Sequence, residues 1–347
     1  MNIIQFVNSD GQQRVGVVNG SEAADLTAVA PEISGTVALA SSAIREGCTL
    51  AAKVEQLAQN APCVDYEALW SAHHGSECGY LLPPLTGPSK HQTFITGTGL
   101  THTGSMESRD KMHSGDAETV DETPVTDSAM MFEMGLQGGK PDGENRGVAP
   151  EWFYKGNGFN LRSHREDLEL PAFAGDGGEE PELVGCYLID DDGAPRRLGF
   201  AVGNEWSDHA TETINYLYLA PSKLRACAVG PELVLGHDFE DLDVRCNVTR
   251  DDAVIYDSGD LKSGERYMCH SLRNCEDHHF KYPLHRQPGD VHLHFFGTSK
   301  LSHSDRDWKY QAGDEITVEV AEFSRPLINI VRNGDPALIK PMRVETC

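Results

Sequence analysis

A succession of short strand-like segments between residues 183 and 331 constrains the fold of this chain more than any other feature. The first two, 183–189 and 196–203, are joined by a turn at 190–195 that is rich in aspartate and contains glycine and proline. Five further segments follow, with few helical patterns between them: 243–249, 253–256, 291–296, 315–320 and 327–331. This spacing favours a mainly β (α+β) domain, built as a rolled β-sandwich or barrel.

The N-terminal part of the chain has a different pattern. Residues 1–30 are β-rich with a turn at Asn19-Gly20, and residues 36–60 carry an apolar stripe at helical spacing. The segment 82–88 is dense in proline and glycine, which is typical of a linker. Because 347 residues exceed one ordinary core, we expect a small N-terminal α/β domain at 1–85 and a larger domain at 86–347.

The segment 114–147 interrupts the larger domain. It is polar, acidic and glycine-rich, except for an apolar stretch at 129–136 that predicts a short helix. Such an excursion is either a lid over a site or an insertion that serves packing or oligomer contacts.

The charge balance excludes several classes of partner. Acidic residues outnumber basic ones by 54 to 29, a net charge of −25, which argues against binding nucleic acid or an anionic membrane. No apolar run reaches the roughly 18 residues needed to span a bilayer. The first residues lack the basic and apolar regions of a signal peptide, so we expect a cytoplasmic protein. The 9 cysteines contain no Cys-x-x-Cys pair, which disfavours disulfide frameworks and zinc knuckles.

Glu180 and Glu182 are the strongest candidates for chemistry. At the start of a strand, residues i and i+2 point to the same face, and two like charges held together need a proton or a cation between them. Carboxylate pairs suit Mg2+, with Mn2+ or Ca2+ as alternatives, better than zinc. The alternative interpretation is a solvated strand face, which is common for charged side chains.

These residues belong to an ordered series of blocks. The other blocks are Gly-Thr-Gly-Leu-Thr-His at 97–102, Pro-Glu-Trp-Phe-Tyr-Lys at 150–155, Gly-Phe-Ala-Val-Gly-Asn-Glu-Trp-Ser-Asp at 199–208, Pro-Ser-Lys-Leu at 221–224 with Gly-Pro at 230–231, Gly-Asp…Gly-Thr-Ser at 289–299, and Gly-Asp-Glu-Ile-Thr-Val-Glu-Val at 313–320. In this order, over roughly residues 90 to 335, the series resembles the fumarylacetoacetate hydrolase family.

The resemblance implies a catalytic domain at 86–347 with that family's fold, a bound divalent cation, a small 2-keto acid substrate and a homodimer. It assigns the cation to Glu180, Glu182 and Glu205. At the last position the family has an aspartate, so the extra methylene of Glu205 changes how that carboxylate reaches the cation.

The resemblance also assigns the remaining site residues. The family's active-site lysine falls on Lys223, and its substrate-contacting threonine falls on Thr298, flanked by Gly297 and Ser299. Beside a cation, in a partly desolvated pocket, the pKa of Lys223 is expected to be lowered, so that it can act as a base or proton shuttle.

Two reactions share the metal-bound enolate that this chemistry implies. The first is dehydration of a 2-keto-3-deoxy sugar acid of the pentonate type. The second is hydrolysis of a carbon–carbon bond in an acylpyruvate or other 2,4-diketo acid. The block ending at His102 lacks the asparagine and tyrosine of the hydrolases and is closer to the family's sugar-acid dehydratase branch, so we favour a metal-dependent hydro-lyase. A non-catalytic sugar-acid-binding protein is a third possibility.

Three residues near that block are candidates for proton transfer or carboxylate binding: His102, Glu107 and Arg109. Two competing patterns lie further along the chain. Residues 268–279 contain zinc-type ligands with poor spacing, so a polar helix is favoured there. His292 and His294 would share one strand face without a local acidic partner.

Overall fold

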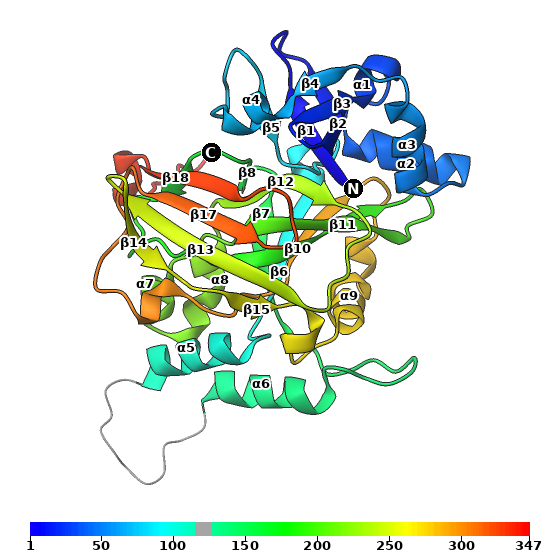
Figure 1. Cartoon of the computed structure of the whole chain (residues 1–347). Helices are drawn as coiled ribbons and strands as arrows, with labels where there is room; N and C mark the ends of the chain where they lie inside the picture. Colours follow the sequence, from blue (N-terminus) through cyan, green and yellow to red (C-terminus); the bar gives the residue numbers. More distant parts are fainter. Residues whose placement is uncertain (115–125) are drawn as a thin grey trace.

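The computed structural model describes residues 1–114 and 126–347 and contains two β-sheets (Figure 1). The mainly β prediction is confirmed. The first sheet has the strand order β4 (Cys63–Asp65), β3 (Glu22–Asp25), β2 (Gln13–Asn19), β1 (Asn2–Val7), β12 (Cys227–Val234), β11 (Pro195–Asn204), β10 (Pro181–Ile189), β16 (Val291–Phe295), β6 (Thr93–Gly99) and β7 (Glu151–Asn157). Two short strands join it at the side, β5 (Tyr80–Leu82) on β1 and β8 (Leu161–Arg162) on β12.

The second sheet is smaller and is built from the C-terminal half of the chain. Its order is β14 (Ala253–Asp257), β13 (Leu242–Arg250), β17 (Glu315–Val320), β18 (Leu327–Asn333) and β9 (Leu168–Leu170), with β15 (Leu261–Ser263) paired to β13.

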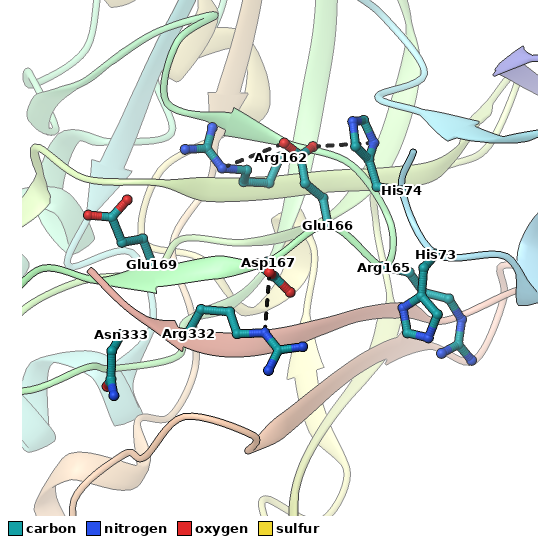
Figure 2. A pocket seen from close by; sticks show the side chains of 9 residues that line it. All are labelled: His73, His74, Arg162, Arg165, Glu166, Asp167, Glu169, Arg332 and Asn333. Atoms are coloured by element: carbon teal, nitrogen blue, oxygen red, sulfur yellow. Dashed lines mark hydrogen bonds and ion pairs between the residues drawn. The ribbon is translucent and has the colours of Figure 1, made fainter. Parts of the chain in front are cut away.

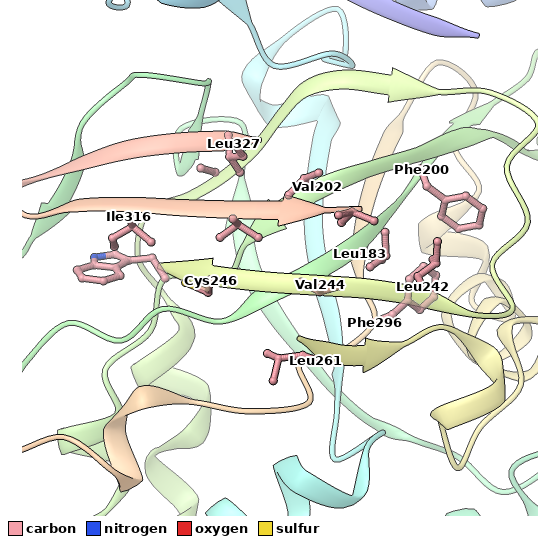
Figure 3. Close-up of a cluster of buried hydrophobic side chains, with 14 of the residues drawn as sticks. Leu183, Phe200, Val202, Leu242, Val244, Cys246, Leu261, Phe296, Ile316 and Leu327 are labelled. Atoms are coloured by element: carbon pink, nitrogen blue, oxygen red, sulfur yellow. The ribbon is translucent and has the colours of Figure 1, made fainter. Parts of the chain in front are cut away.

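Strand β10 is the centre of the molecule because both of its faces are buried. Leu183, Tyr187 and Ile189 point into an apolar core between the two sheets, where they meet Val244 and Leu327 of the second sheet (Figure 3). The intervening side chains point to the opposite face, into a second core that includes the N-terminal helices. A strand that is apolar on both faces reads as a continuous apolar run, which is what residues 183–189 show.

The N-terminal strands continue the large sheet. Strand β1 pairs with β12 in antiparallel register, with Asn2 opposite Val234 and Ile3 opposite Leu233. The helices of this part, α1 (Leu26–Val29), α2 (Thr36–Glu46), α3 (Leu50–Ala58) and α4 (Tyr66–Ser71), lie at one end of the molecule (Figure 1). The predicted helical segment 36–60 is confirmed, with a break at Gly47, whose φ of +70° ends α2.

The remaining helices lie around the sheets. They are α5 (Thr103–Ser114), α6 (Asp127–Gly138), α7 (His209–Glu212), α8 (Leu219–Lys223) and α9 (Leu272–Phe280), with 3-10 turns η1 (Lys90–Gln92), η2 (Tyr216–Tyr218), η3 (Glu265–Tyr267), η4 (Pro283–His285), η5 (Ser302–Ser304) and η6 (Pro336–Ile339). Helices α5 and α6 lie at the end opposite the N-terminal helices (Figure 1).

Helix α6 confirms the short helix predicted at 129–136. Residues 115–125 of the predicted excursion lie outside the described residues, and its role as a lid stays a prediction. None of the helices in the described ranges combines the length and apolarity needed to traverse a bilayer.

Candidate active site

Three buried carboxylates converge where β10 begins and β11 ends. Glu182 lies in β10, Glu180 precedes that strand, and Glu205 follows β11. Pairing of Pro181 with Asn204 brings the two strand ends together, and the backbone N–H of Glu205 donates to the carbonyl of Glu180 at 2.9 Å. One carboxylate oxygen from each glutamate lies within 4.8 Å of the other two. The structure therefore brings together the three side chains that the resemblance predicts as cation ligands.

A tight turn after β16 holds one of these carboxylates. The backbone N–H of Gly297 donates to Glu182 Oε2 at 2.7 Å. Gly297 has a φ of +90°, and a Cβ on this residue would lie 2.2 Å from Thr101 Oγ1. Only glycine fits here without displacing the turn that aims the N–H group at Glu182.

The charges of the three carboxylates oppose one another. Burial and the neighbouring charges of Glu205 and Glu180 raise the pKa of Glu182 well above its usual range. Burial and the charge of Glu180 also raise the pKa of Glu205. Burial acts in the same sense on Glu180, but Lys223 and His209 outweigh it and lower the pKa of that carboxyl. The three buried carboxylates offer only oxygen ligands, and together they hold more negative charge than their neighbours neutralise. Such a group fits a hard divalent cation.

Lys223 lies at the end of α8 and is fully buried. Its ammonium group donates to Glu180 Oε1 and, at 3.1 Å, to Glu205 Oε2. Burial lowers the pKa of Lys223, but the charges of Glu180 and Glu205 outweigh burial, so the pKa is raised. The expectation of a lowered pKa took only the cation and desolvation into account, whereas the structure shows two carboxylates in direct contact with the ammonium group.

A second buried lysine, Lys155 at the end of the block at 150–155, also faces the cluster, although its pattern in the sequence did not mark it as a site residue. Lys155 Nζ lies 3.3 Å from Glu205 Oε1 and donates to the carbonyl of Trp206. Glu205 is thus held between Lys155 on one oxygen and Lys223 on the other. The signal that could have found Lys155 is the alternation in β7, where it shares a buried face with Glu151 and Phe153.

His209 is another neighbour that sequence reasoning missed. Its Nε2 lies 3.0 Å from Glu180 Oε1 in a hydrogen bond. The residue stands at the first position of α7, which the side chain of Asp208 caps by accepting from the N–H of Thr211. The imidazole fits only because Gly178 has no side chain, since a Cβ there would lie 2.2 Å from His209 Nδ1.

Arg109 is placed close to the cluster but is already paired. Its guanidinium group donates to Glu151 at 2.7 Å, and its Nε lies 3.0 Å from Glu212 of α7. Tyr216 donates to the same Glu151 carboxylate at 2.8 Å. Burial lowers the pKa of Arg109, but the charges of Glu151 and Glu212 outweigh it and raise the pKa. In this arrangement Arg109 ties α5 to β7 and α7, and its predicted contact with a substrate carboxylate stays a prediction.

The imidazole of His102 makes no hydrogen bond to the three carboxylates among the described residues. Its hydrogen-bond partners are Thr101 Oγ1 at 2.9 Å and Ser263 Oγ at 3.5 Å. Burial lowers the pKa of His102 to about 4, so the imidazole is neutral at pH 7. The structure does not bring His102 to the cluster, and its role in proton transfer stays a prediction.

The segment after Gly297 faces a separate hollow. The hydroxyl of buried Thr298 donates to the carbonyl of Lys300 at 3.0 Å, and Ser299 donates to the carbonyl of Lys262. Ser299 and the predicted candidate Glu107 both line a pocket of about 340 Å³ between α5 and this turn. This places the predicted substrate-binding segment beside open space as well as beside Glu182.

A larger pocket of about 600 Å³ lies elsewhere, where the segment after α4 meets β9 and the end of β18 (Figure 2). Its charged side chains pair with one another: Arg332 with Asp167 at 3.2 Å, and Arg162 with Glu166 at 3.7 Å (Figure 2). None of the three clustered carboxylates lines this pocket.

Of the zinc-type residues at 268–279, Cys275, His278 and His279 lie in α9, the polar helix that was favoured for this segment, and Cys269 and His270 precede it. Among the side chains of residues 1–109 and 126–347, the one group of three or more arranged to hold a metal ion is Glu180, Glu182 and Glu205.

Solved structures with a similar fold cover almost the whole chain. A 2-keto-3-deoxy-D-arabinonate dehydratase in its apo form aligns over 96% of this chain and 100% of its own, with a TM-score of 0.68 and 17% identity. The same enzyme complexed with magnesium and 2,5-dioxopentanoate gives a TM-score of 0.67 and 18% identity, over 96% and 99% of the two chains. A fumarylacetoacetate hydrolase from Exiguobacterium antarcticum gives a TM-score of 0.58 and 16% identity, over 96% and 99%. The predicted fold is therefore confirmed.

Sequence comparison reaches a shorter part of the chain. A probable 2-keto-3-deoxyxylonate dehydratase of Haloferax volcanii is 29% identical over 128 residues, which is 35% of this chain and 42% of that protein. The chain thus matches less than half of the length of this curated relative. No protein-family model matches the chain.

Proposed function

We propose that this protein is a Mg2+-dependent dehydratase of a 2-keto-3-deoxy sugar acid of the pentonate type, and a member of the fumarylacetoacetate hydrolase family. The observation that carries the proposal is the buried set of Glu180, Glu182 and Glu205 with Lys223 in contact with two of them. The similarity to two sugar-acid dehydratases, one in sequence and one in fold, supports the choice of substrate class.

The three glutamates would hold the cation. When bound, Mg2+ supplies a Lewis-acid charge that stabilises negative charge developing on the substrate's keto oxygen. The carboxylates are already positioned to bind a cation, because the Gly297 N–H orients Glu182 and the backbone hydrogen bond between Glu205 and Glu180 fixes the spacing of these two residues. Mn2+ and Ca2+ remain alternatives, since both also take oxygen ligands.

Lys223 is the proposed proton carrier. Dehydration requires removal of a proton from C3 and departure of the C4 hydroxyl, which needs a proton to leave as water. A lysine buried against two carboxylates can exchange a proton at its Nζ without contact with bulk water. Lys155 would then act as a positioning residue, because it holds the Glu205 oxygen that Lys223 does not contact.

The substrate carboxylate is proposed to bind at the turn of Gly297, Thr298 and Ser299, of which Ser299 lines a pocket. The hydroxyls of Thr298 and Ser299 donate to backbone carbonyls in this structure and would turn toward the substrate on binding. His102 and Arg109 are retained as candidates for proton transfer and carboxylate binding. The contacts of each with other protein groups mean that either role requires a rearrangement.

Hydrolysis of a carbon–carbon bond in an acylpyruvate is the second candidate function. It is supported by the similarity in fold to a fumarylacetoacetate hydrolase. It is weakened by the placement of His102, which hydrogen-bonds to Thr101 and Ser263 and not to a carboxylate that would orient it for activating water. A non-catalytic sugar-acid-binding protein would have no use for the buried Lys223 beside the carboxylates.

The location, oligomeric state, partners and domain division of the protein are also proposals. We propose a cytoplasmic homodimer with a small 2-keto acid as its ligand and no nucleic-acid or membrane partner. The division into an N-terminal domain at 1–85 and a catalytic domain at 86–347 is retained as part of it. Analytical ultracentrifugation tests the oligomeric state.

The decisive experiment is an assay with Mg2+ and a 2-keto-3-deoxypentonate. Loss of water from this substrate leaves 2,5-dioxopentanoate, whose aldehyde can be detected by a coupled oxidation. Pyruvate release from an acylpyruvate would instead identify the hydrolase, and thermal stabilisation by the sugar acid without turnover would identify a binding protein.

A further inference from the structure

A buried group of four histidines lies on the face of the large sheet opposite the second core. We call His279, His285, His292 and His294 the imidazole cluster. The imidazole cluster comes from three elements, α9, η4 and β16, and each member is at most 8% exposed. The ring of His279 is the centre, at 4.6, 4.9 and 4.8 Å from the rings of His285, His292 and His294.

The hydrogen bonds of this cluster run in one direction. Trp152 Nε1 donates to His279 Nδ1 at 3.2 Å, so His279 carries its proton on Nε2. That nitrogen lies 2.9 Å from His292 Nδ1 and therefore donates to it. His292 must then carry its own proton on Nε2, which is buried without a hydrogen-bond partner in the described structure.

In this arrangement each ring nitrogen of His279 and His292 either carries a proton or accepts a hydrogen bond, so neither ring has a free nitrogen for a further proton. Protonation of His279 would put an N–H on Nδ1, directly opposite the N–H of Trp152. Protonation of His292 would put an N–H on Nδ1, opposite the N–H of His279. Either event replaces a hydrogen bond by two donors that face each other, and adds an unpaired charge in a buried site.

The side chains around the relay do not offset that charge, although the backbone carbonyl of His285 favours the charged form of His292. From β16 and η4 the cluster is faced by His294 and His285, which would add like charge. From β6 it is faced by neutral residues, with His294 bonded to Thr96 Oγ1 at 2.8 Å and to Thr98 Oγ1 at 2.7 Å, and Phe94 stacked on His292 at 5.0 Å.

The charged side chains on the packed elements turn to other partners. On α9, Glu276 accepts from Tyr187 and Arg197, Asp277 pairs with Arg146, and His278 bonds to Lys281 and to the carbonyl of Gly147. Burial lowers the pKa of His292 and His294 to about 3, and that of His279 well below its usual range.

We propose that the relay from Trp152 through His279 to His292 is a proton-operated latch that holds α9 and η4 on the sheet. While both imidazoles are neutral the latch is closed. Acidification opens it, because His279 and His292 bind a proton readily in the open state and only weakly in the closed state. The latch is independent of the dehydratase proposal, since none of its residues contacts the three glutamates among the hydrogen bonds and ion pairs of the described residues.

The test is an acid titration of the whole protein followed by the fluorescence of Trp152. The chain has 4 tryptophans, so the Trp152→Phe variant identifies the signal of this residue. With two relay histidines taking up protons, the opening constant is expected to rise about 100-fold for each unit of pH below about 6.5. The far-UV circular dichroism should stay constant through this step, because only the packing of α9 and η4 is released.

The informative variant is His279→Gln. A glutamine amide can accept from Trp152 and donate to His292 as neutral histidine does, but it cannot take up a proton. The slope of the transition should then fall from about two protons to about one. The exposed His91 provides a control, and His91→Gln should leave the transition unchanged.

An unchanged slope in His279→Gln would overturn the latch, as would loss of the far-UV signal in the same single step, which would indicate global unfolding. If His279→Gln does not fold, His292→Phe serves as the second variant. It keeps the stack on Phe94 and should lower the slope by the same one proton.

Discussion

The carboxylate cluster and the imidazole cluster are both buried polar groups on the large sheet, and they differ in the charged groups that contact them. The three glutamates lie against Lys223, Lys155 and His209, and burial together with mutual repulsion raises the pKa of Glu182 and Glu205. In the imidazole cluster burial lowers the pKa of His279, His292 and His294, and His279 donates to His292 as one neutral imidazole to another. Strand β10, which carries Glu182, and strand β16, which carries His292 and His294, are direct neighbours in the sheet.

This contrast between the carboxylate cluster and the imidazole cluster indicates which of the two can bind an ion. A neutral relay whose bonds are made internally has little to gain from an added ion. A set of carboxylates that repel one another is stabilised by any cation that fits between them. We therefore expect the two regions to respond to different variables, the first to divalent cations and the second to pH.

The largest effect is expected from Lys223→Met, which removes the proposed proton carrier and keeps the apolar stem. Turnover should fall by about 10²- to 10⁴-fold, the range for loss of a general acid or base, while substrate still binds. Steady-state kinetics and substrate titration by calorimetry measure the two quantities. The exposed Lys340 offers a matched control, and normal turnover in Lys223→Met would remove this residue from the mechanism.

Glu182→Gln should weaken Mg2+ binding by about 100-fold, because the amide keeps the shape of the side chain but loses its charge. Calorimetry with Mg2+ alone measures the affinity without reference to activity. Glu55→Gln, at an exposed position of α3, is the control. Equal Mg2+ affinity in the two variants would contradict the assignment of Glu182 as a ligand.

Mg2+ itself should stabilise the folded protein. At a free concentration of about 100 times Kd, the free energy of unfolding should rise by about 2.7 kcal/mol, measured by urea denaturation at pH 7.5. EDTA should reverse the gain. The Glu182→Gln variant should show a much smaller gain at the same concentration. No dependence on Mg2+ in the native protein would mean that the carboxylates do not bind Mg2+.

The imidazole cluster predicts a loss of stability in acid. The pKa of His292 and of His294 is lowered to about 3 in the folded protein, so between pH 6.5 and 3 the unfolded chain binds more protons than the folded one. Their stabilising contribution is complete above pH 6.5 and falls by about 1.4 kcal/mol per pH unit for each of these histidines. Urea denaturation of native protein and of His294→Gln at several pH values between 7 and 5 measures the slope. A slope that His294→Gln leaves unchanged would contradict this account.

Patterns local in sequence were predictable because they depend on neighbours along the chain. The strand-like segments 183–189 and 196–203 with the turn between them indicated β10 and β11, and the i, i+2 spacing indicated that Glu180 and Glu182 act together. The shared face of His292 and His294 followed from the same rule. Their relation to His279 did not, because α9 lies against β16 only in the folded chain.

Contacts between distant segments were the part that could not be predicted. Nothing near Lys155 in the sequence indicates that it reaches Glu205, and the raised pKa of Lys223 depends on two carboxylates from other elements. The pairing of Arg109 with Glu151 and Glu212 could not be predicted either, because the three residues belong to three separate elements, α5, β7 and α7.

The pairing of β1 with β12 has a practical consequence for dissecting this protein. A truncation that starts the chain after residue 85 would uncover the edge of β12 at Leu233 and Val234, together with the apolar surface that the first helices cover. Such an uncovered edge recruits strands from other chains. A shortened catalytic fragment is therefore expected to aggregate unless a substitute strand is supplied in trans.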